Sequence, residues 1–180
     1  MELTAAQAIP RWLSFFGVDM TPFEQAFENT IGLEGGFVDN PADPGGATMY
    51  GITERVARAN GYTGDMHDLP LATAQAIAKA EYWDKYQCDK LVPLVAVQVF
   101  DAAYNGGDVV RWLQQASGAV VDGVIGPKTI TAVNLTNPYV MVMRFLALRL
   151  EYLTNLPIWG NFGKGWSRRI AHNLQLGASK

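Results

Sequence analysis

The chain has 180 residues, about half of them apolar and 17% charged, with a formal net charge of −3. This composition excludes disorder and allows one compact domain, or one domain with a small annex. No apolar run reaches the roughly 20 residues that cross a bilayer, and a lone Cys88, expected to be buried, excludes an internal disulfide framework. Two histidines, His67 and His172, are too few for a metal cluster and are expected at the surface.

The amino-terminal segment, residues 1–20, does not read as a secretory signal. It lacks a basic start and a small-residue cleavage site, and Pro10 and Arg11 interrupt its apolar stretch. The sequence therefore predicts a protein made in the cytoplasm without a signal peptide. Charge is unevenly placed: residues 1–140 hold 8 basic and 16 acidic side chains, whereas residues 141–180 hold 6 basic side chains and only Glu151. This cationic section is either a solvated helix face or a surface that attracts an anionic polymer.

The first predicted helix starts at Thr21-Pro22-Phe23-Glu24. Thr is a good cap, Pro suits the first turn, and Glu three residues later closes a capping box. Apolar residues then recur at helical spacing as far as Ile31, and Gly35-Gly36 ends the helix.

Residues 35–52 are too rich in glycine and proline for a helix. Phe37-Val38 and Met49-Tyr50 flank two turn-forming runs, so we expect a small β-hairpin or ordered loop. Helical patterns resume from Thr53, a plausible cap, and the sequence predicts further helices at about 53–59, 72–88, 93–104, 108–117, 127–134, 138–154 and 164–176. Asn137-Pro138 is the start signal of the helix at 138–154, with Asn137 as its cap. The predicted fold is mainly α, with one small β-hairpin after the first helix.

Glu34 continues the apolar stripe of the first helix and is predicted to face inward. Burial and the negative end of the helix dipole both favour its protonated form. A carboxyl group that keeps its proton to about pH 6 can protonate a glycosidic oxygen. Asp43 and Thr48 follow on the predicted hairpin, where a carboxylate and a hydroxyl can hold a water molecule across a cleft. Taken singly, each residue also has an ordinary structural explanation: Glu34 as the end of a helix, Asp43 as the first residue of a turn and Thr48 as a strand residue.

Two runs, Glu34-Gly35-Gly36-Phe37 and Asp43-Pro44-Gly45-Gly46-Ala47-Thr48-Met49-Tyr50-Gly51-Ile52, resemble the signature of glycoside hydrolase family 108. The family usually has Tyr where this chain has Phe37. The resemblance continues through Tyr82-Trp83, Phe100-Asp101, Asn105-Gly106 and Leu113-Gln114. It ends in Asp122-Gly123-Val124-Ile125-Gly126-Pro127-Lys128-Thr129, which looks like an element of a peptidoglycan-binding region.

The resemblance implies a lysozyme-like N-acetylmuramidase of the bacteriophage endolysin or prophage type. Such an enzyme cleaves the β-1,4 bond between N-acetylmuramic acid and N-acetylglucosamine. Glu34 would be the general acid, and Asp43 and Thr48 would orient the attacking water. The substrate would lie between the end of the Glu34 helix and the hairpin. The implied partner is the peptidoglycan glycan strand, met after release from the host cytoplasm. No cofactor, metal, nucleic acid or stable membrane insertion is implied, and we expect a monomer.

Two alternatives remain open: a lytic transglycosylase, which needs no water-holding residues, and a wall-binding module without activity, resting on residues 108–134. That segment either binds the wall or only completes the fold. The predicted organisation is an extension at residues 1–20, a catalytic region at 21–90 and a helical region at 91–180, packed as one globular unit.

Several aromatic and polar residues have both a binding and a structural reading. Tyr50 and Asn105 are predicted to contact substrate, although Asn105 could simply end a helix. Aromatics on one helix could stack on sugar rings or belong to the core; they are Tyr82, Trp83 and Tyr86. Trp166, Arg168 and Arg169 could contact wall polymer, but a neighbouring helix is the favoured reading.

Overall fold

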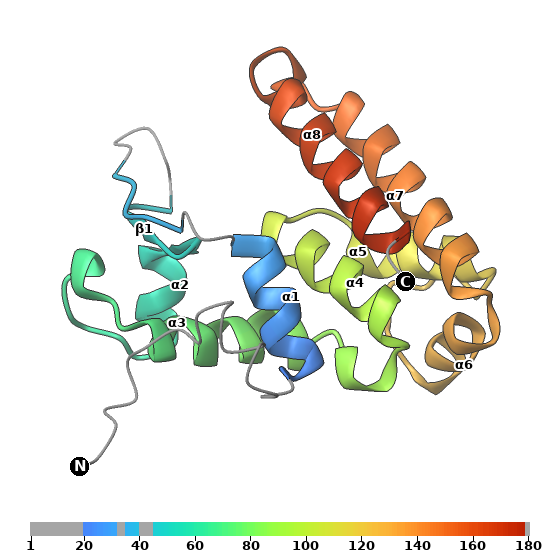
Figure 1. Cartoon of the computed structure of the whole chain (residues 1–180), viewed down its shortest axis with the longest axis horizontal. Helices are drawn as coiled ribbons and strands as arrows, with labels where there is room; N and C mark the ends of the chain where they lie inside the picture. The colour runs from blue at the N-terminus through green and yellow to red at the C-terminus, as the bar shows by residue number, and fades with distance from the viewer. Residues whose placement is uncertain (1–19, 32–34, 40–44, 179–180) are drawn as a thin grey trace. The chain divides into compact units, whose positions relative to one another are not determined.

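A computed structural model describes residues 20–31, 35–39 and 45–178. The chain forms two compact units, residues 1–85 and 86–180. The described residues are mainly helical, with one two-stranded antiparallel hairpin (Figure 1), so the predicted fold class is confirmed. No helix among the described residues is long and apolar enough to cross a membrane. The predicted domain boundaries, and the packing of the chain as one globular unit, stay predictions.

Helix α1 (Pro22–Ile31) begins with the predicted capping box. The Glu24 backbone N–H donates to Thr21 Oγ1 at 3.2 Å, and the Thr21 N–H donates to Glu24 Oε2 at 2.8 Å. The buried face of α1 carries Phe23, whose ring meets the edge of Trp83 at 5.7 Å between centroids. This aromatic pair forms part of the core of the first unit.

The rest of the first unit comprises the hairpin strands β1 (Thr48–Met49) and β2 (Ile52–Thr53), helix α2 (Glu54–Ala59), a 3-10 turn at Met66–Asp68 and helix α3 (Leu71–Ala78). The predicted cap at Thr53 is confirmed, since its Oγ1 accepts from the Val56 N–H at 3.4 Å. His67 is exposed, as expected of a surface histidine.

The single helix predicted over residues 72–88 is wrong. Helix α3 gives way to a π-helix at Lys79–Asp84, then Gln87 adopts a left-handed conformation (φ 53°) and a 3-10 turn follows at Cys88–Lys90. An ion pair of 2.5 Å joins Lys79 Nζ to Asp84 Oδ1, five residues apart, the spacing that aligns side chains on a π-helix. Apolar periodicity does not distinguish this wider turn from an α-helix.

The second unit comprises helices α4 (Pro93–Asn105), α5 (Val109–Ser117), α6 (Pro127–Leu135), α7 (Pro138–Thr154) and α8 (Trp159–Ala178). The Asn137 cap predicted for α7 is confirmed, because its side chain accepts from the Tyr139 and Val140 N–H groups. Cys88 and His172 have the expected burial: the thiol is buried and His172 is exposed.

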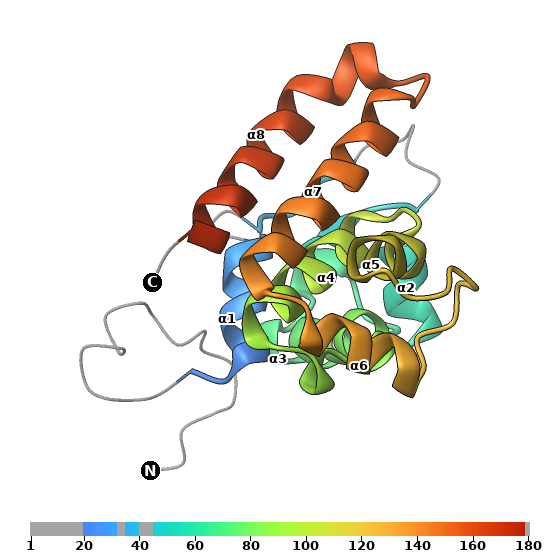
Figure 2. The same cartoon turned by 90° about the vertical axis from the view of Figure 1, so that its right-hand side faces the viewer.

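Helices α7 and α8 form an antiparallel hairpin whose far end, where α7 finishes and α8 starts, projects away from α4 and α5 (Figures 1 and 2). The start predicted for α8 near residue 164 is wrong by five residues, since the helix begins at Trp159. Three glycines between residues 160 and 165 argued against a helix there. One of them, Gly163, is needed inside it: a Cβ at this position would lie 2.6 Å from the Trp159 indole.

Candidate active site

Thr48 lies on strand β1, and its backbone is held from both sides. It pairs with Thr53 on β2 and exchanges two hydrogen bonds with Val38, at 2.8 and 2.7 Å. Its side chain is half-buried, and within the described ranges its hydroxyl has no hydrogen-bond partner. The backbone that carries the hydroxyl is therefore fixed in position, and the hydroxyl can bond to a water molecule or a ligand.

The backbone at Gly35 touches the backbone at Tyr50. The Tyr50 N–H donates to the Gly35 carbonyl oxygen at 3.1 Å. A Cβ on Gly35 would lie 2.4 Å from Ile31 Cγ2 and 3.3 Å from Tyr50 Cα, so only glycine fits without displacement. Tyr50 itself has φ 51°, a region that a non-glycine residue occupies at a cost of order 1–3 kcal/mol. Strain of this kind concentrates at functional sites.

Both carboxylates predicted from the sequence, Glu34 and Asp43, lie outside the described residues. Their described neighbours are anchored. Gly35, directly after Glu34, is bonded to Tyr50.

The hairpin is also tied to the start of α2. The Arg55 N–H donates to the Gly45 carbonyl oxygen at 3.1 Å, and the Glu54 N–H donates to Ala47 at 2.7 Å. Gly46 has φ 76°, and a Cβ there would lie 2.9 Å from a Glu54 carboxylate oxygen. The glycines of the Asp-Pro-Gly-Gly run thus serve close packing on α2.

The aromatic residues predicted to face sugar rings separate into two groups. Trp83 is 1% exposed, so it is a core residue, the second of the two interpretations given from the sequence. Tyr82 and Tyr86 are half-buried, Tyr82 in the π-helix and Tyr86 at the start of the second unit. Burial raises the pKa of Tyr86, and Cys88 adds to the effect. A sugar contact at Tyr82 stays a prediction.

Asn105 is the last residue of α4 and is exposed. Its Nδ2 donates to the Asp101 carbonyl oxygen at 2.7 Å, and Gly106 follows with φ 84°. The helix-ending reading of Asn105 is therefore shown, while a contact with a substrate acetamide stays a prediction.

Sequence reasoning missed the buried charge network around Asp101. Its Oδ2 accepts from Arg149 Nη1 at 2.5 Å and from Asn173 Nδ2 at 2.7 Å, and its Oδ1 accepts from Arg169 Nε at 2.8 Å. Burial alone would raise the pKa of Asp101, but Arg149 and Arg169 outweigh it and hold the pKa below its usual value. The signal was an acidic residue inside the apolar run Val99-Phe100-Asp101-Ala102-Ala103. The network also confirms that Arg169 contacts a neighbouring helix.

The Asp122–Thr129 run forms a loop organised by a buried glutamine. Gln114, fully buried, donates to Asp122 Oδ1 at 2.6 Å and to the Val124 carbonyl oxygen at 3.0 Å, and accepts from the Gly123 N–H at 2.9 Å. Gln114 Nε2 also donates to the Thr129 hydroxyl at 3.3 Å. Bonds from the Val124 N–H and Gln114 lower the pKa of Asp122. The polar side chains of this motif therefore hold the loop together.

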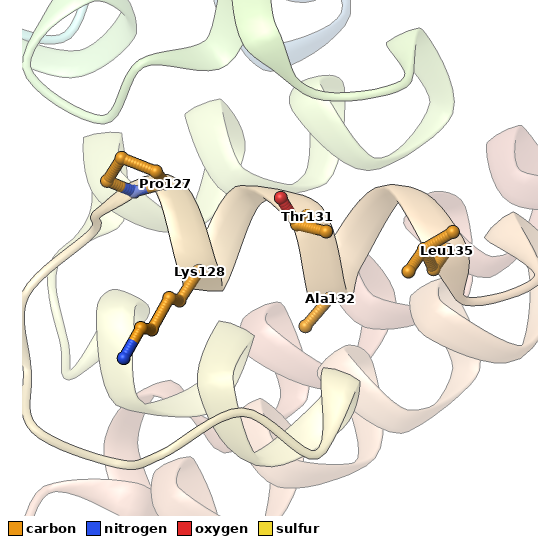
Figure 3. Close-up of a pocket in the computed structure, with 5 residues that line it drawn as sticks. All are labelled: Pro127, Lys128, Thr131, Ala132 and Leu135. Atoms are coloured by element: carbon orange, nitrogen blue, oxygen red, sulfur yellow. The ribbon is translucent and has the colours of Figure 1, made fainter.

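Beside this loop, helix α6 borders a shallow, mainly apolar hollow of about 390 Å³. Figure 3 shows its lining residues along one side of the helix: Pro127, Lys128, Thr131, Ala132 and Leu135. The hollow carries no acidic side chain and no aromatic ring. It offers no carboxylic acid, the group that glycosidases use to protonate a glycosidic oxygen.

Comparison with known proteins identifies the two parts of the chain. Residues 27–107 match the family described as "Glycosyl hydrolase 108", and residues 108–171 match the family described as "Predicted Peptidoglycan domain". No curated protein matches the chain. Among solved structures, SagA of Brucella abortus is 33% identical, with a TM-score of 0.77 over 87% of this chain and 93% of that one. The chain therefore belongs to glycosyl hydrolase family 108 and is a glycosidase that carries a predicted peptidoglycan-binding region.

Proposed function

We propose that the protein is an N-acetylmuramidase that hydrolyses the β-1,4 bond between N-acetylmuramic acid and N-acetylglucosamine in peptidoglycan. Family membership supports a glycosidase, and the second matched region supports a wall polymer as its substrate. The observation that carries the site assignment is the contact between Gly35 and Tyr50, which brings the residue after Glu34 to the hairpin that holds Thr48.

In the proposed reaction, Glu34 donates its proton to the glycosidic oxygen as the bond from that oxygen to the anomeric carbon breaks. A water molecule attacks the same carbon, and Asp43 accepts the proton that the water loses. The Thr48 hydroxyl orients this water. The products are two shorter glycan strands, one of which ends in a reducing N-acetylmuramic acid.

The carboxylate separation that distinguishes inversion from retention involves Glu34 and Asp43. Inversion or retention is therefore determined by a separate experiment, which follows the anomeric configuration of the first-formed product.

The decisive test is mass spectrometry of peptidoglycan digested by wild type and by Glu34→Gln. Reducing ends from wild type, and a near-complete loss of product with Glu34→Gln, are the expected results. The exchange is isosteric and removes the proton donor, so the far-UV circular dichroism spectrum should not change. Glu151→Gln is the matched control, because Glu151 is an exposed glutamate on α7.

Two outcomes would refute the proposal. Anhydro-muropeptide products would identify a lytic transglycosylase, in which the sugar's own 6-hydroxyl attacks. Undiminished clearing by Glu34→Gln would remove Glu34 from the mechanism.

We also propose an endolysin role, in which the enzyme reaches the wall after release from the cytoplasm. Support comes from the resemblance to phage lysins, whereas the solved relative belongs to a bacterium. Expression inside a bacterial cell should leave the wall intact until the membrane is permeabilised. Lysis without permeabilisation would contradict this role.

A further inference from the structure

Three aromatic rings gather at the start of α8, at the projecting end of the α7–α8 hairpin. Phe162 stacks on Trp166 with centroids 5.8 Å apart and planes inclined by 27°, and Trp159 lies 6.0 Å from Trp166. Phe162 is 53% exposed, and both indoles are partly exposed. We call Trp159, Phe162 and Trp166 the aromatic platform.

The platform is built into the helix. Its rings stand at positions i, i+3 and i+7, which place them along one face over roughly 10 Å. The Trp159 indole lies over Gly163, where a Cβ would meet three of its ring atoms at 2.6 to 3.0 Å. Glycine inside a helix is unfavourable relative to alanine because it loses more backbone freedom on folding. The position of the indole thus depends on a residue that the helix would otherwise disfavour.

The surroundings of the platform are polar and cationic. Lys164 and Arg168 are exposed on the same helix, and in the part of the chain that the structure describes neither forms an ion pair. Glu151 is the only acidic residue between 141 and 180. Ile158, directly before Trp159, is a 49% exposed aliphatic side chain, but Gly160, Asn161 and Gly165 add little, so lipid chains would find a small apolar area to bury.

Among the described residues, the rest of the predicted peptidoglycan region also exposes the rings of Tyr139 and Tyr152, but neither stacks on another exposed ring as Phe162 does on Trp166. The Asp122 and Thr129 side chains of the loop bond to Gln114 and to the backbone of Val124, and the hollow beside α6 has no aromatic ring. Aromatic faces bind the C–H faces of pyranose rings, and cations attract the carboxylates of the wall peptides and of muramic acid residues that carry no peptide. Resting on the proposed function for its choice of polymer, the geometry points to the aromatic platform as a binding site for peptidoglycan glycan strands, formed by other residues than those proposed to cleave the bond.

The test is co-sedimentation of the full chain with purified peptidoglycan sacculi, using Phe162→Ala and, as matched control, Leu135→Ala. Leu135 is an apolar side chain in the same region, on α6, and is 83% exposed. Loss of one stacked ring should weaken binding about two- to tenfold, whereas the control should bind as wild type does. Hydrolysis of short soluble glycan fragments should be unchanged in both variants.

A second pair of variants tests the packing of the Trp159 indole on Gly163. Gly163→Ala forces Trp159 to move and should weaken sedimentation. Gly165→Ala is the same exchange two residues away, where a Cβ meets nothing within 4 Å, and should not weaken it. Equal binding by Phe162→Ala and Leu135→Ala would overturn the proposal.

Co-sedimentation with phosphatidylglycerol vesicles gives a second control. If Phe162→Ala weakened binding to these vesicles and left binding to sacculi unchanged, the proposal would be overturned and the platform identified as a membrane-binding surface. If the wild type binds sacculi, Phe162→Ala weakens this binding, and no reducing ends are released, the platform is upheld and the muramidase assignment is refuted.

Discussion

Asp101→Asn tests the buried charge network that joins α4 to α7 and α8. Both carboxylate oxygens of Asp101 accept from donors: Oδ1 from Arg169, and Oδ2 from Arg149 and Asn173. An amide in the same place turns one acceptor into an NH2 group that faces another donor, whichever way it is oriented. The exchange also removes the negative charge that neutralises Arg149.

The expected cost follows from burial. The Arg149 side chain is 3% exposed and that of Arg169 is 31% exposed, so the loss is dominated by Arg149. Breaking a buried pair by removing one partner costs about 3–5 kcal/mol, since it leaves an uncompensated charge. Asp84→Asn is the matched control. Its ion pair with Lys79 is equally short, 2.5 Å, but both side chains are about half exposed, and such pairs contribute roughly 0–1 kcal/mol.

The assay is guanidinium denaturation of the full chain followed by far-UV circular dichroism. Two units can give two transitions, and Asp101 belongs to the unit formed by residues 86–180. Asp101→Asn should lower the midpoint of one transition, while Asp84→Asn should change either midpoint little. If both variants lose the same free energy of unfolding, the reasoning from burial is refuted.

The pH dependence gives the same network a second signature. The folded-state pKa of Asp101 lies below its value in the unfolded chain, about 3.9. Its contribution to stability is therefore complete above that value and is lost as the pH falls through the folded-state pKa. The stability difference between wild type and Asp101→Asn should be constant near neutral pH and shrink below about pH 4. A difference that grew with acidification would contradict the sign of the shift.

Three further changes test the site and the motif loop. Thr48→Val removes a hydroxyl without changing shape and should lower muropeptide release by about ten- to a hundredfold at unchanged stability. Its control is Thr53→Val, which removes the α2 cap and should lower the free energy of unfolding by about 1 kcal/mol without lowering activity. Gly35→Ala should destabilise the first unit by about 1–3 kcal/mol, and Ile31→Ala should recover part of it in a double-mutant cycle of thermal denaturation. Gln114→Ala should lower the free energy of unfolding by about 2–3 kcal/mol in a denaturant titration, because buried loop groups lose their partners. A loss below about 0.5 kcal/mol would show that the loop keeps its structure without Gln114.

Local signals predicted much of the fold. The capping box at Thr21, the caps at Thr53 and Asn137 and the hairpin near residue 50 each depend on a few adjacent residues, and each forms as expected. The π-helix could not be predicted this way. Its defining turn is wider by one residue, and the Lys79–Asp84 pair that marks it has no distinctive side-chain chemistry.

The candidate site was predictable in its residue types and less so in its geometry. The Glu-Gly-Gly and Asp-Pro-Gly-Gly runs indicated a family, but not that Gly35 and Tyr50 would touch, because that contact joins residues 15 apart. The Asp101 network joins residues 48, 68 and 72 positions apart. Nothing local predicts which arginine meets a buried carboxylate.

The boundary between the two matched families does not coincide with a packing boundary. Helix α4 falls in the glycosyl hydrolase match, which ends at residue 107, while α7 and most of α8 fall in the peptidoglycan match. Asp101 on α4 bonds to Arg149 on α7 and to Arg169 on α8, so both ion pairs described for it cross that boundary. Division at residue 107 would leave Asp101 without either arginine and expose the apolar face of α4. The helices after residue 107 therefore complete the structure of the hydrolase region, and any wall binding by the aromatic platform is added to that structural role.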